Sequence, residues 1–341
     1  MRNLRVLVLV DEDLLPPDSI EDFTDEEVAP WKTEYDVIVS LKELGHEVRP
    51  LGVRDDLGVI GAALKSFKPH IVFNLIEEFG GLGTCVPYVL GYLELVNQAY
   101  TGCNPRGLVL SDNKVLMKKL LRYHRIPVPD FAVFPRQKAV RRPPRLAFPL
   151  IVKTAAEHGS MGIAQASVVY DDDKLQERVA FVHEQQNTDA LAESYIDGRE
   201  LYVGVMGNHR LLTFPIWEMV FEKLADGSLP IATDKVKWDL RYQKRRGIKT
   251  QAAEGLSDEM QQRIWRLCRR AFRVLGQTGY ARLDLRLTPE GKLHVLESNP
   301  NPNLAFGEDF TESAESSGIE YGQLIQRILN LGLRYHAQHR R

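Results

Sequence analysis

The chain has 341 residues, of which 44% are apolar and 26% are charged, and its formal net charge is −2. These values are typical of a soluble globular enzyme of two or three domains, and they exclude a disordered or fibrous protein. The near-neutral charge provides no overall attraction for nucleic acid or for an anionic membrane, so any phosphate-binding site must be local.

Targeting and redox signals in the chain are few. The apolar run at residues 4–10 is too short to span a membrane, and no small-residue cleavage site of a signal peptide follows it. The three cysteines, Cys85, Cys103 and Cys268, are odd in number and form no CxxC pair. We therefore expect a cytoplasmic protein with reduced, buried thiols and no membrane partner.

The first third of the chain alternates strands with helices. Apolar runs predict strands at residues 4–10, 47–51 and 70–76, and helical spacing predicts helices at residues 37–44 and 84–95. This alternation indicates βαβ units and a parallel sheet with right-handed crossovers, which places the chain in the α/β class.

The middle of the chain predicts a second, mixed unit. Ser111 has the residue type of an N-cap for a helix that carries Lys114. A glycine-bearing loop at residues 157–162 is expected to join two short strands as a hairpin. The predicted elements are strands at residues 149–154, 164–170 and 189–193 and a helix at residues 173–184.

Strands predominate after Tyr202, and a long polar loop is predicted at residues 223–251. Ser257 is expected to cap a helix whose apolar side chains share one face. Those side chains are Ile264, Leu267, Cys268, Ala271, Phe272 and Leu275. A closing helix is expected at residues 321–333.

The segment at residues 279–299 is predicted to form a hairpin around a Thr-Pro-Glu-Gly turn. Alternation along its strands places Arg282 and Asp284 on one face, and Glu297 and Asn299 on the same side. If Leu287 and Lys292 flank the loop, Arg282 lies opposite Glu297.

In that register Asp284 lies opposite Val295 and diagonal to Glu297. Asp284, Glu297 and Asn299 supply the hard oxygen ligands that Mg²⁺ prefers, and Arg282 suits a transferring phosphoryl group or an oxyanion. The alternative is a solvent-facing hairpin with ordinary ion pairs. The proline- and asparagine-rich segment that follows favours a metal site.

Several cations upstream suit the phosphates of a nucleotide. Lys153 ends a strand before the loop at residues 157–162, in which two glycines and Ser160 offer donors to phosphate oxygens. Neither the P-loop pattern nor GxGxxG is present, and a plain glycine hairpin is the alternative.

The stretch from Lys235 to Lys249 is strongly basic and fits a lid that closes over phosphates, with a solvated loop as the alternative. Its aromatic residues, Trp238 and Tyr242, are too few for stacking on nucleic acid, so no nucleic-acid partner is expected.

In their order and spacing, these segments resemble the ATP-grasp superfamily, and most closely its D-alanine–D-alanine ligase branch. The resemblance covers most of the chain after residue 71. It rests on residues 100–102 (YTG), 111–114 (SDNK), 151–153 (IVK), 157–162 (EHGSMG), 193–200 (ESYIDGRE) and 279–299.

The resemblance implies a three-domain ATP-grasp fold with ATP held between the second and third domains. The implied domains are an N-terminal Rossmann-like domain at residues 1–107, a central subdomain at 108–193 and a C-terminal subdomain with lid and metal site at 194–341. Related enzymes also suggest a homodimer.

The resemblance further implies residue roles in a ligase that works through an acyl phosphate. Lys114 and Lys153 would contact the nucleotide phosphates, and Lys237 would reach the terminal phosphate from the lid. The implied adenine hinge is formed by Glu193, Tyr195 and Ile196.

In the same way, Glu200 would hold the ribose hydroxyls, and Arg282 and Ser160 would act in catalysis. Asp284, Glu297 and Asn299 would bind two Mg²⁺ ions, or Mn²⁺ in their place.

The substrate end departs from the branch pattern. Where the branch has a glycine-rich turn with a substrate-binding glutamate, this chain has an acidic segment that starts at Asp11. The loop serine of the branch falls at Gly159, its lid tyrosine at Trp238, and its final serine and glycine at residues 301–303, which end in Asn303. Substrates other than two D-alanine molecules are therefore expected.

We hypothesise that Glu12, Glu77 or Glu78 receives the ammonium group of an amino acid or peptide, with Trp238 and Asn303 also near the substrate. The expected function is an ATP-dependent carboxylate–amine ligase. The alternatives are a ligase that uses a non-amino-acid nucleophile and a nucleotide-binding protein of this fold without catalysis.

Overall fold

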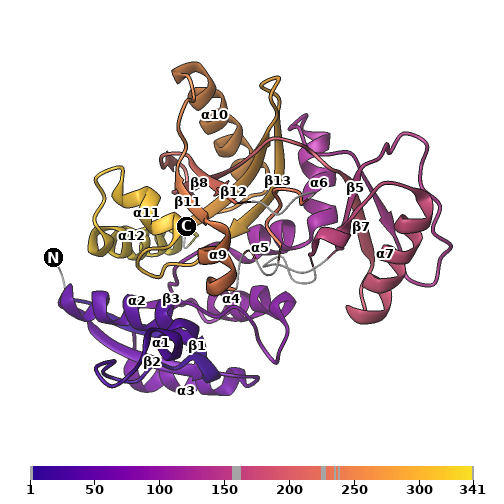
Figure 1. The fold of residues 1–341 in the computed structure, drawn as a ribbon. Helices are drawn as coiled ribbons and strands as arrows, with labels where there is room; N and C mark the ends of the chain where they lie inside the picture. Colours follow the sequence, from indigo (N-terminus) through magenta and orange to yellow (C-terminus); the bar gives the residue numbers. More distant parts are fainter. Residues whose placement is uncertain (1–2, 156–162, 224–227, 234–235, 237–238, 340–341) are drawn as a thin grey trace.

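The computed structural model describes residues 3–155, 163–223, 228–233, 236 and 239–339. Within these residues the strands form three sheets, which follow one another along the chain (Figure 1). No helix in this part of the chain is long and apolar enough to cross a membrane.

The N-terminal sheet is parallel and has the order β2-β1-β3. Its strands are β1 (Arg5–Asp11), β2 (Glu47–Val53) and β3 (Ile71–Asn74). The accompanying helices are α1 (Asp25–Val28), α2 (Lys32–Glu43), α3 (Leu57–Phe67) and α4 (Val86–Leu95), with short 3-10 turns η1 (Glu12–Leu14), η2 (Ala29–Trp31) and η3 (Gly83–Cys85). The predicted βαβ arrangement is confirmed.

Both faces of this sheet are covered, which explains the apolar run in β1. The side chains from Val6 to Val10 are fully buried. On one face they pack in a cluster with α2 and with α12 (Tyr321–His339), and on the other they pack with α3 and α4. The C-terminal helix thus shares a core with the N-terminal sheet.

Two helices follow, α5 (Pro105–Asp112) and α6 (Lys114–Tyr123), and they correct one prediction. Asn104 caps α5, whose first residue is a proline, so the helix already contains Ser111. The extended residue Asn113 separates the two helices and caps α6 by accepting from the Leu116 amide at 2.9 Å. The predicted N-cap at Ser111 is therefore wrong.

The central sheet is antiparallel and has the order β4-β7-β5-β6. Its strands are β4 (Phe131–Phe134), β5 (Leu150–Thr154), β6 (Val168–Val169) and β7 (Ala190–Ser194), with α7 (Asp172–Gln185) packed against it. The strand predicted at residues 164–170 is shorter than expected, because η4 (Gln165–Ser167) forms a 3-10 turn there.

The C-terminal sheet has the order β11-β10-β8-β12-β13, and β9 pairs with β8. The strands are β8 (Arg199–Met206), β9 (Leu212–Thr213), β10 (Trp217–Phe221), β11 (Ile248–Ala252), β12 (Tyr280–Leu287) and β13 (Leu293–Pro300). Helix α10 (Asp258–Val274) lies against it, and α11 (Asp309–Glu315) precedes α12.

The expected cap and apolar face of α10 are confirmed. The Ser257 hydroxyl accepts from the Met260 amide at 3.2 Å. Of the predicted face, only Leu267 is not fully buried. The closing helix α12 is longer than predicted and extends to His339.

The polar loop predicted at residues 223–251 is only partly a loop. Its second half holds α9 (Leu240–Arg246) and the edge strand β11, which pairs with β10. Gly247, with φ +58°, ends α9 in the left-handed conformation that favours glycine. The strand was missed because an edge strand with one half-exposed face has no strong apolar pattern.

The domain boundaries expected after residues 107 and 193 stay a prediction. The first falls inside α5, and the second falls inside β7.

Candidate active site

A cleft lies between the central and C-terminal sheets, and it contains about 740 Å³ of empty space, part of it open to solvent. The predicted residues that line it are Lys114, Lys153, Glu193, Tyr195, Ile196, Glu200, Asp284 and Glu297. Residues that were selected from separate segments of the sequence are thus brought together.

The carboxylate hairpin forms as β12 and β13, but its register differs from the prediction. Asp284 lies opposite Glu297, and Arg282 lies opposite Asn299. A β-bulge after Asp284 shifts the pairing, with Leu296 as the additional residue on β13. The predicted Arg282–Glu297 pairing is therefore wrong.

The pairing of Asp284 with Val295 is wrong as well, because Val295 lies opposite Leu285. The bulge has a chemical consequence. It places the two candidate metal carboxylates, Asp284 and Glu297, directly opposite each other, which is a closer arrangement than the predicted diagonal.

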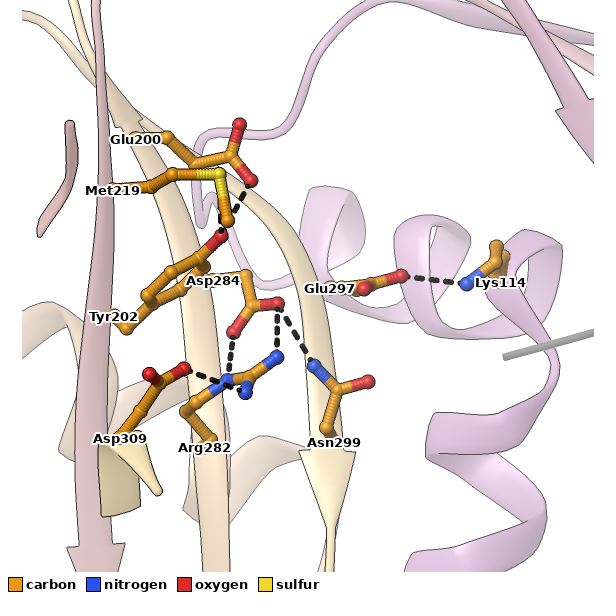
Figure 2. A network of polar contacts seen from close by, with 9 residues as sticks. All are labelled: Lys114, Glu200, Tyr202, Met219, Arg282, Asp284, Glu297, Asn299 and Asp309. Carbon is orange, nitrogen blue, oxygen red and sulfur yellow. Dashed lines mark hydrogen bonds and ion pairs between the residues drawn. The ribbon is translucent and has the colours of Figure 1, made fainter. Parts of the chain in front are cut away.

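Arg282 is held on three sides, as Figure 2 shows. Its Nε and Nη2 donate to the two carboxylate oxygens of Asp284 at 2.8 and 3.0 Å, and Nη1 donates to Asp309 at 3.2 Å. Its guanidinium also lies 4.7 Å from the ring centre of Tyr202. Burial disfavours the charge, but Asp284 and Asp309 outweigh it and raise the pKa of Arg282.

The second carboxylate, Glu297, accepts from Lys114 Nζ at 2.6 Å across the cleft (Figure 2). Burial opposes the charge of Lys114, but Glu297, Glu193 and Asp284 raise its pKa, so the lysine stays cationic. Asn299 Nδ2 donates to Asp284 at 3.0 Å. The other atom of the amide group, Oδ1, is an acceptor.

Glu193 lines the cleft and is only 1% exposed. Its Oε2 is 3.3 Å from Lys118 Nζ and 3.8 Å from Lys153 Nζ. Burial raises the pKa of Glu193, but Lys118, Lys153 and Lys114 together hold it below the usual value. Its other oxygen, Oε1, is buried without a hydrogen-bond partner in the described structure, so the cleft presents an unused acceptor.

Lys118 was not predicted from the sequence. It is fully buried, and its Nζ also donates to the Leu296 carbonyl at 2.7 Å. Burial lowers its pKa to about 8. A signal was available, because Lys118 follows Lys114 by four residues and therefore lies on the same face of α6.

Glu200 pairs with a second missed residue, Arg286, at 2.6 Å. Arg286 also donates to the carbonyls of Gly198 and Pro230, each at 2.7 Å, and it is 4% exposed. The Tyr202 hydroxyl donates to the other oxygen of Glu200 at 3.0 Å. Alternation along β12 puts Arg286 on the face of Arg282 and Asp284, so the same reasoning applied one step further predicts it.

The substrate candidates lie in different surroundings. Glu12 is bound by Arg54 at 2.6 Å, in a largely exposed ion pair. Glu77 and Glu78 are exposed after β3. Asn303 accepts from the Thr33 hydroxyl at 2.6 Å. Three other predicted residues, Ser160, Lys237 and Trp238, lie outside the described residues.

The donor set of Asp284, Glu297 and Asn299 fits Mg²⁺ in kind. In the described part of the chain, no third acidic, histidine or cysteine side chain joins the two carboxylates. Mg²⁺ commonly binds through one or two carboxylates and takes its other ligands from water and substrate phosphates.

Comparison with known proteins agrees with this geometry. The family model described as "D-ala D-ala ligase C-terminus" matches residues 120–330. The uncharacterized protein y4sG of Sinorhizobium fredii is 31% identical over 310 residues, which cover 87% of this chain and 86% of that protein. The D-alanine–D-alanine ligase of Desulfovibrio desulfuricans is 27% identical over 297 residues, which cover 87% of this chain and 90% of the enzyme.

Solved structures show the same fold. The D-alanine–D-alanine ligase of Bacillus anthracis, in a complex with ATP, aligns with a TM-score of 0.76 at 21% identity and covers 98% of this chain and 99% of its own. The enzyme of Coxiella burnetii aligns with a TM-score of 0.72 at 18% identity, covering 99% of this chain and 96% of its own. The chain belongs to the D-alanine–D-alanine ligase family of ATP-grasp proteins.

Proposed function

We propose that this protein is a magnesium-dependent ligase that uses ATP to join a carboxylate to an amine through an acyl phosphate. One observation carries the proposal. The cationic side chains of Lys114 and Lys153, the carboxylate of Glu193 and the paired carboxylates Asp284 and Glu297 line a single cleft. A nucleotide triphosphate with its metal requires this combination.

The cleft offers a matching group to each part of ATP. Glu193 Oε1, buried and unpaired in the described structure, suits the amino group of adenine, beside Tyr195 and Ile196. Glu200, fixed by Arg286, is the candidate for the ribose hydroxyls. Lys114 and Lys153 are the candidates for the phosphates.

Mg²⁺, when bound by Asp284, Glu297 and Asn299, would neutralise charge on the phosphate oxygens. In the present structure Lys114 and Arg282 compensate the two carboxylates. Release of Lys114 from Glu297 would free its ammonium group for a phosphate. Two metal ions, with Mn²⁺ as a substitute for Mg²⁺, remain part of the proposal.

The chemistry has two steps, in which the chain positions the reactants and stabilises charge. A substrate carboxylate oxygen attacks the γ-phosphorus and ADP leaves, which forms the acyl phosphate. An amine nitrogen then attacks the carbonyl carbon, loses a proton, and inorganic phosphate leaves. Arg282, fixed by Asp284 and Asp309, is placed to stabilise the oxyanion of the second step.

Ser160 and Lys237 are proposed to add a loop donor and a lid cation at the transferring phosphate. The lid function of the basic segment is also a proposal. The described part of that segment is ordered as α9 and β11, with Lys249 bound to Glu222 at 2.7 Å.

We propose an amino acid or a peptide other than two D-alanine molecules as the substrate. The support is the acidic segment after β1, where the branch has a glycine-rich turn, together with Asn303 in place of a glycine. Glu77, Glu78, Trp238 and Asn303 stay candidates for substrate contact. Glu12 is a weaker one, because Arg54 already holds its carboxylate.

A panel assay tests the function. ADP release is measured with Mg²⁺ over amino acids and dipeptides, and hydroxylamine is added to trap an acyl phosphate as hydroxamate. ADP and hydroxamate with one class of carboxylate support the ligase. No ADP release with any candidate would favour the alternative of a non-catalytic nucleotide-binding protein.

A second outcome is ADP release and hydroxamate formation in an enzyme that joins the carboxylate to none of the amino acid acceptors. It would favour the other alternative, a ligase for a non-amino-acid nucleophile. A homodimer is also proposed, and sedimentation equilibrium of the full chain measures it.

A further inference from the structure

One buried lysine of α6 contacts both sheets that enclose the cleft. The Nζ of Lys118 donates to the Leu296 carbonyl of β13 at 2.7 Å and lies 3.3 Å from Glu193 Oε2 on β7. Glu193 belongs to the central sheet, and Leu296 belongs to the C-terminal sheet. A single ammonium group therefore joins the two sides of the cleft.

Packing alone does not explain a lysine at this position. The neighbouring residues Met117 and Leu121 are fully buried in the core of the C-terminal sheet, and Lys118 itself is fully buried. A lysine is almost never fully buried unless its charge is paired. Both residues that the ammonium group of Lys118 contacts, Glu193 and Leu296, line the cleft. The charge at this position therefore serves the cleft, and an apolar side chain would suffice for the core.

At the first contact, Lys118 makes the two oxygens of Glu193 different. Oε2 lies near the ammonium groups of Lys118 and Lys153, at 3.3 and 3.8 Å, whereas Oε1 has no hydrogen-bond partner in the described structure. An ionised carboxylate oxygen is an acceptor only. It favours a ligand that brings an amino group and disfavours one that brings a carbonyl oxygen to the same place.

This selectivity depends on the ionised state of Glu193. Burial raises the pKa of Glu193, but Lys118, Lys153 and Lys114 together hold it below the usual value. Without Lys118, the buried carboxyl group loses its nearest cation and takes up a proton more easily. A protonated carboxyl group offers a donor as well as an acceptor, so it no longer distinguishes an amino group from a carbonyl oxygen.

At the second contact, Lys118 binds the residue that forms the β-bulge. Leu296 is the additional residue on β13, and the bulge places Glu297 opposite Asp284. Lys118 supplies a donor to the Leu296 carbonyl, and Lys114, one turn earlier on the same face of α6, binds the Glu297 side chain at 2.6 Å. One face of α6 therefore holds two consecutive residues of β13, one by its backbone and the other by its carboxylate.

We propose that Lys118 is a positioning residue that selects an adenine base through Glu193 and holds the metal carboxylate Glu297 in place through Leu296. The assignment rests on the proposed function, because it requires a nucleotide and a metal ion in the cleft. Lys118 acts on the nucleotide through Glu193 and on the metal ion through the backbone of β13. The alternative is a lysine that only stabilises the packing of α6 between the two sheets.

Nucleotide binding to the full chain tests the selection of the base without any catalysis. Calorimetry with Mg²⁺ compares ADP with IDP, in which a carbonyl oxygen replaces the amino group of adenine. The wild type should bind ADP at least about tenfold more tightly than IDP, and Lys118→Met should reduce this ratio to about threefold or less. Leu121→Ala, the matched control, removes a fully buried side chain of α6 and should keep the wild-type ratio. An unchanged ratio in Lys118→Met, or an equal loss in Leu121→Ala, would overturn the inference.

Metal binding provides the second measurement. Mn²⁺ is titrated into each protein with saturating ADP, and electron paramagnetic resonance measures the free ion against a protein-free ADP sample. The Kd for Mn²⁺ should rise about tenfold in Lys118→Met, because the support of a proposed metal ligand is lost, and should stay unchanged in Leu121→Ala. Wild-type Mn²⁺ affinity in Lys118→Met would overturn the inference.

A second variant covers the case in which Lys118→Met does not fold. Lys118→Gln keeps an amide donor for the Leu296 carbonyl but brings no charge to Glu193. It should therefore lose the preference for ADP over IDP. A folded Lys118→Gln protein with the wild-type ratio would overturn the inference as well.

The inference and the proposed function fail in different ways. Absence of ADP release with every carboxylate would remove the proposed ligase activity and leave both binding measurements as they stand. An active ligase that binds ADP and IDP equally well would remove only the role of Lys118. A wild type that binds neither nucleotide would overturn both.

Discussion

Four acidic side chains in and beside the cleft are each paired with a basic side chain. The pairs are Asp284 with Arg282, Glu297 with Lys114, Glu193 with Lys118 and Glu200 with Arg286. Removal of one partner from a buried pair leaves an uncompensated charge, which costs far more than the loss of an exposed pair.

The Lys118–Glu193 pair allows a direct test of this difference. Lys118→Met should lower the free energy of unfolding by about 3 kcal/mol, because Glu193 loses the nearer of its two lysines and the Leu296 carbonyl loses its donor. Lys174→Met removes an exposed pair with Glu177 and should cost less than about 1 kcal/mol. Urea unfolding measures both, and equal costs would contradict the account.

The buried carboxyl groups of Asp11, at the end of β1, and Glu34, in the first turn of α2, predict a pH dependence of stability. Burial raises their pKa values on folding, from 3.8 to about 6 and from 4.5 to about 7. The folded protein therefore holds more protons than the unfolded chain between about pH 4 and 7, so stability falls as the pH rises through this window.

Glu34→Gln should remove much of this effect. At pH 8 we expect the variant to be more stable than the wild type by about 1–3 kcal/mol, and at pH 4 we expect little difference. Chemical unfolding at the two pH values measures it. A variant that is less stable than the wild type at pH 8 would show that the carboxylate contributes to folding and does not oppose it.

At the scale of single elements, the faces of the strands were predictable and their register was not. Period-two alternation placed Arg282 and Asp284 on one face of β12 and would have placed Arg286 there too. The bulge at Leu296 has no glycine or proline to mark it, so the sequence does not indicate that Asp284 lies opposite Glu297.

The N-cap of α6 was predicted at the wrong residue. Ser111 has a favourable residue type for a cap, but Asn104 and the proline after it start a helix earlier, and the cap falls at Asn113. Residue type alone does not decide between neighbouring candidates.

Arg286, on β12, donates hydrogen bonds to the carbonyl of Gly198, which precedes β8, and to the carbonyl of Pro230. Arg286→Met should raise the KM for ATP about tenfold or more with a smaller change in kcat, because Glu200 loses the partner that positions it at the proposed ribose site.

Arg199→Met is the matched control, since Arg199 pairs with Glu218 in the same sheet and lies outside the cleft lining. Steady-state kinetics with ATP and with 2′-deoxy-ATP checks the assignment. The Arg286→Met effect should shrink with the deoxynucleotide, and an equal effect would exclude a role at the ribose 2′-hydroxyl.

At the scale of the whole molecule, the C-terminal helix α12 packs against the N-terminal sheet. Its side chains Leu324, Ile325, Ile328 and Leu329 are buried in the cluster that contains β1 and α2. The sequence predicted the helix and the sheet separately. It did not predict their contact, because no local pattern encodes which apolar faces meet.

Ile328→Ala should therefore destabilise the molecule by about 2–4 kcal/mol through a cavity between the first sheet and the last helix. Hydrogen exchange should show that β1 and α12 lose protection together. Lost protection in α12 alone would mean that the terminal helix is not part of the N-terminal core.

The central claim is that the cleft carries metal-dependent ATP chemistry, and the substitution Glu297→Gln tests it most directly. With Mg²⁺, ATP and the active carboxylate, hydroxamate formation should fall by at least about 100-fold, because a neutral amide replaces a proposed metal ligand. Circular dichroism should show the wild-type fold, whereas the melting temperature should fall, because the buried Lys114 loses its charged partner. Full hydroxamate formation by a folded Glu297→Gln protein would contradict the account.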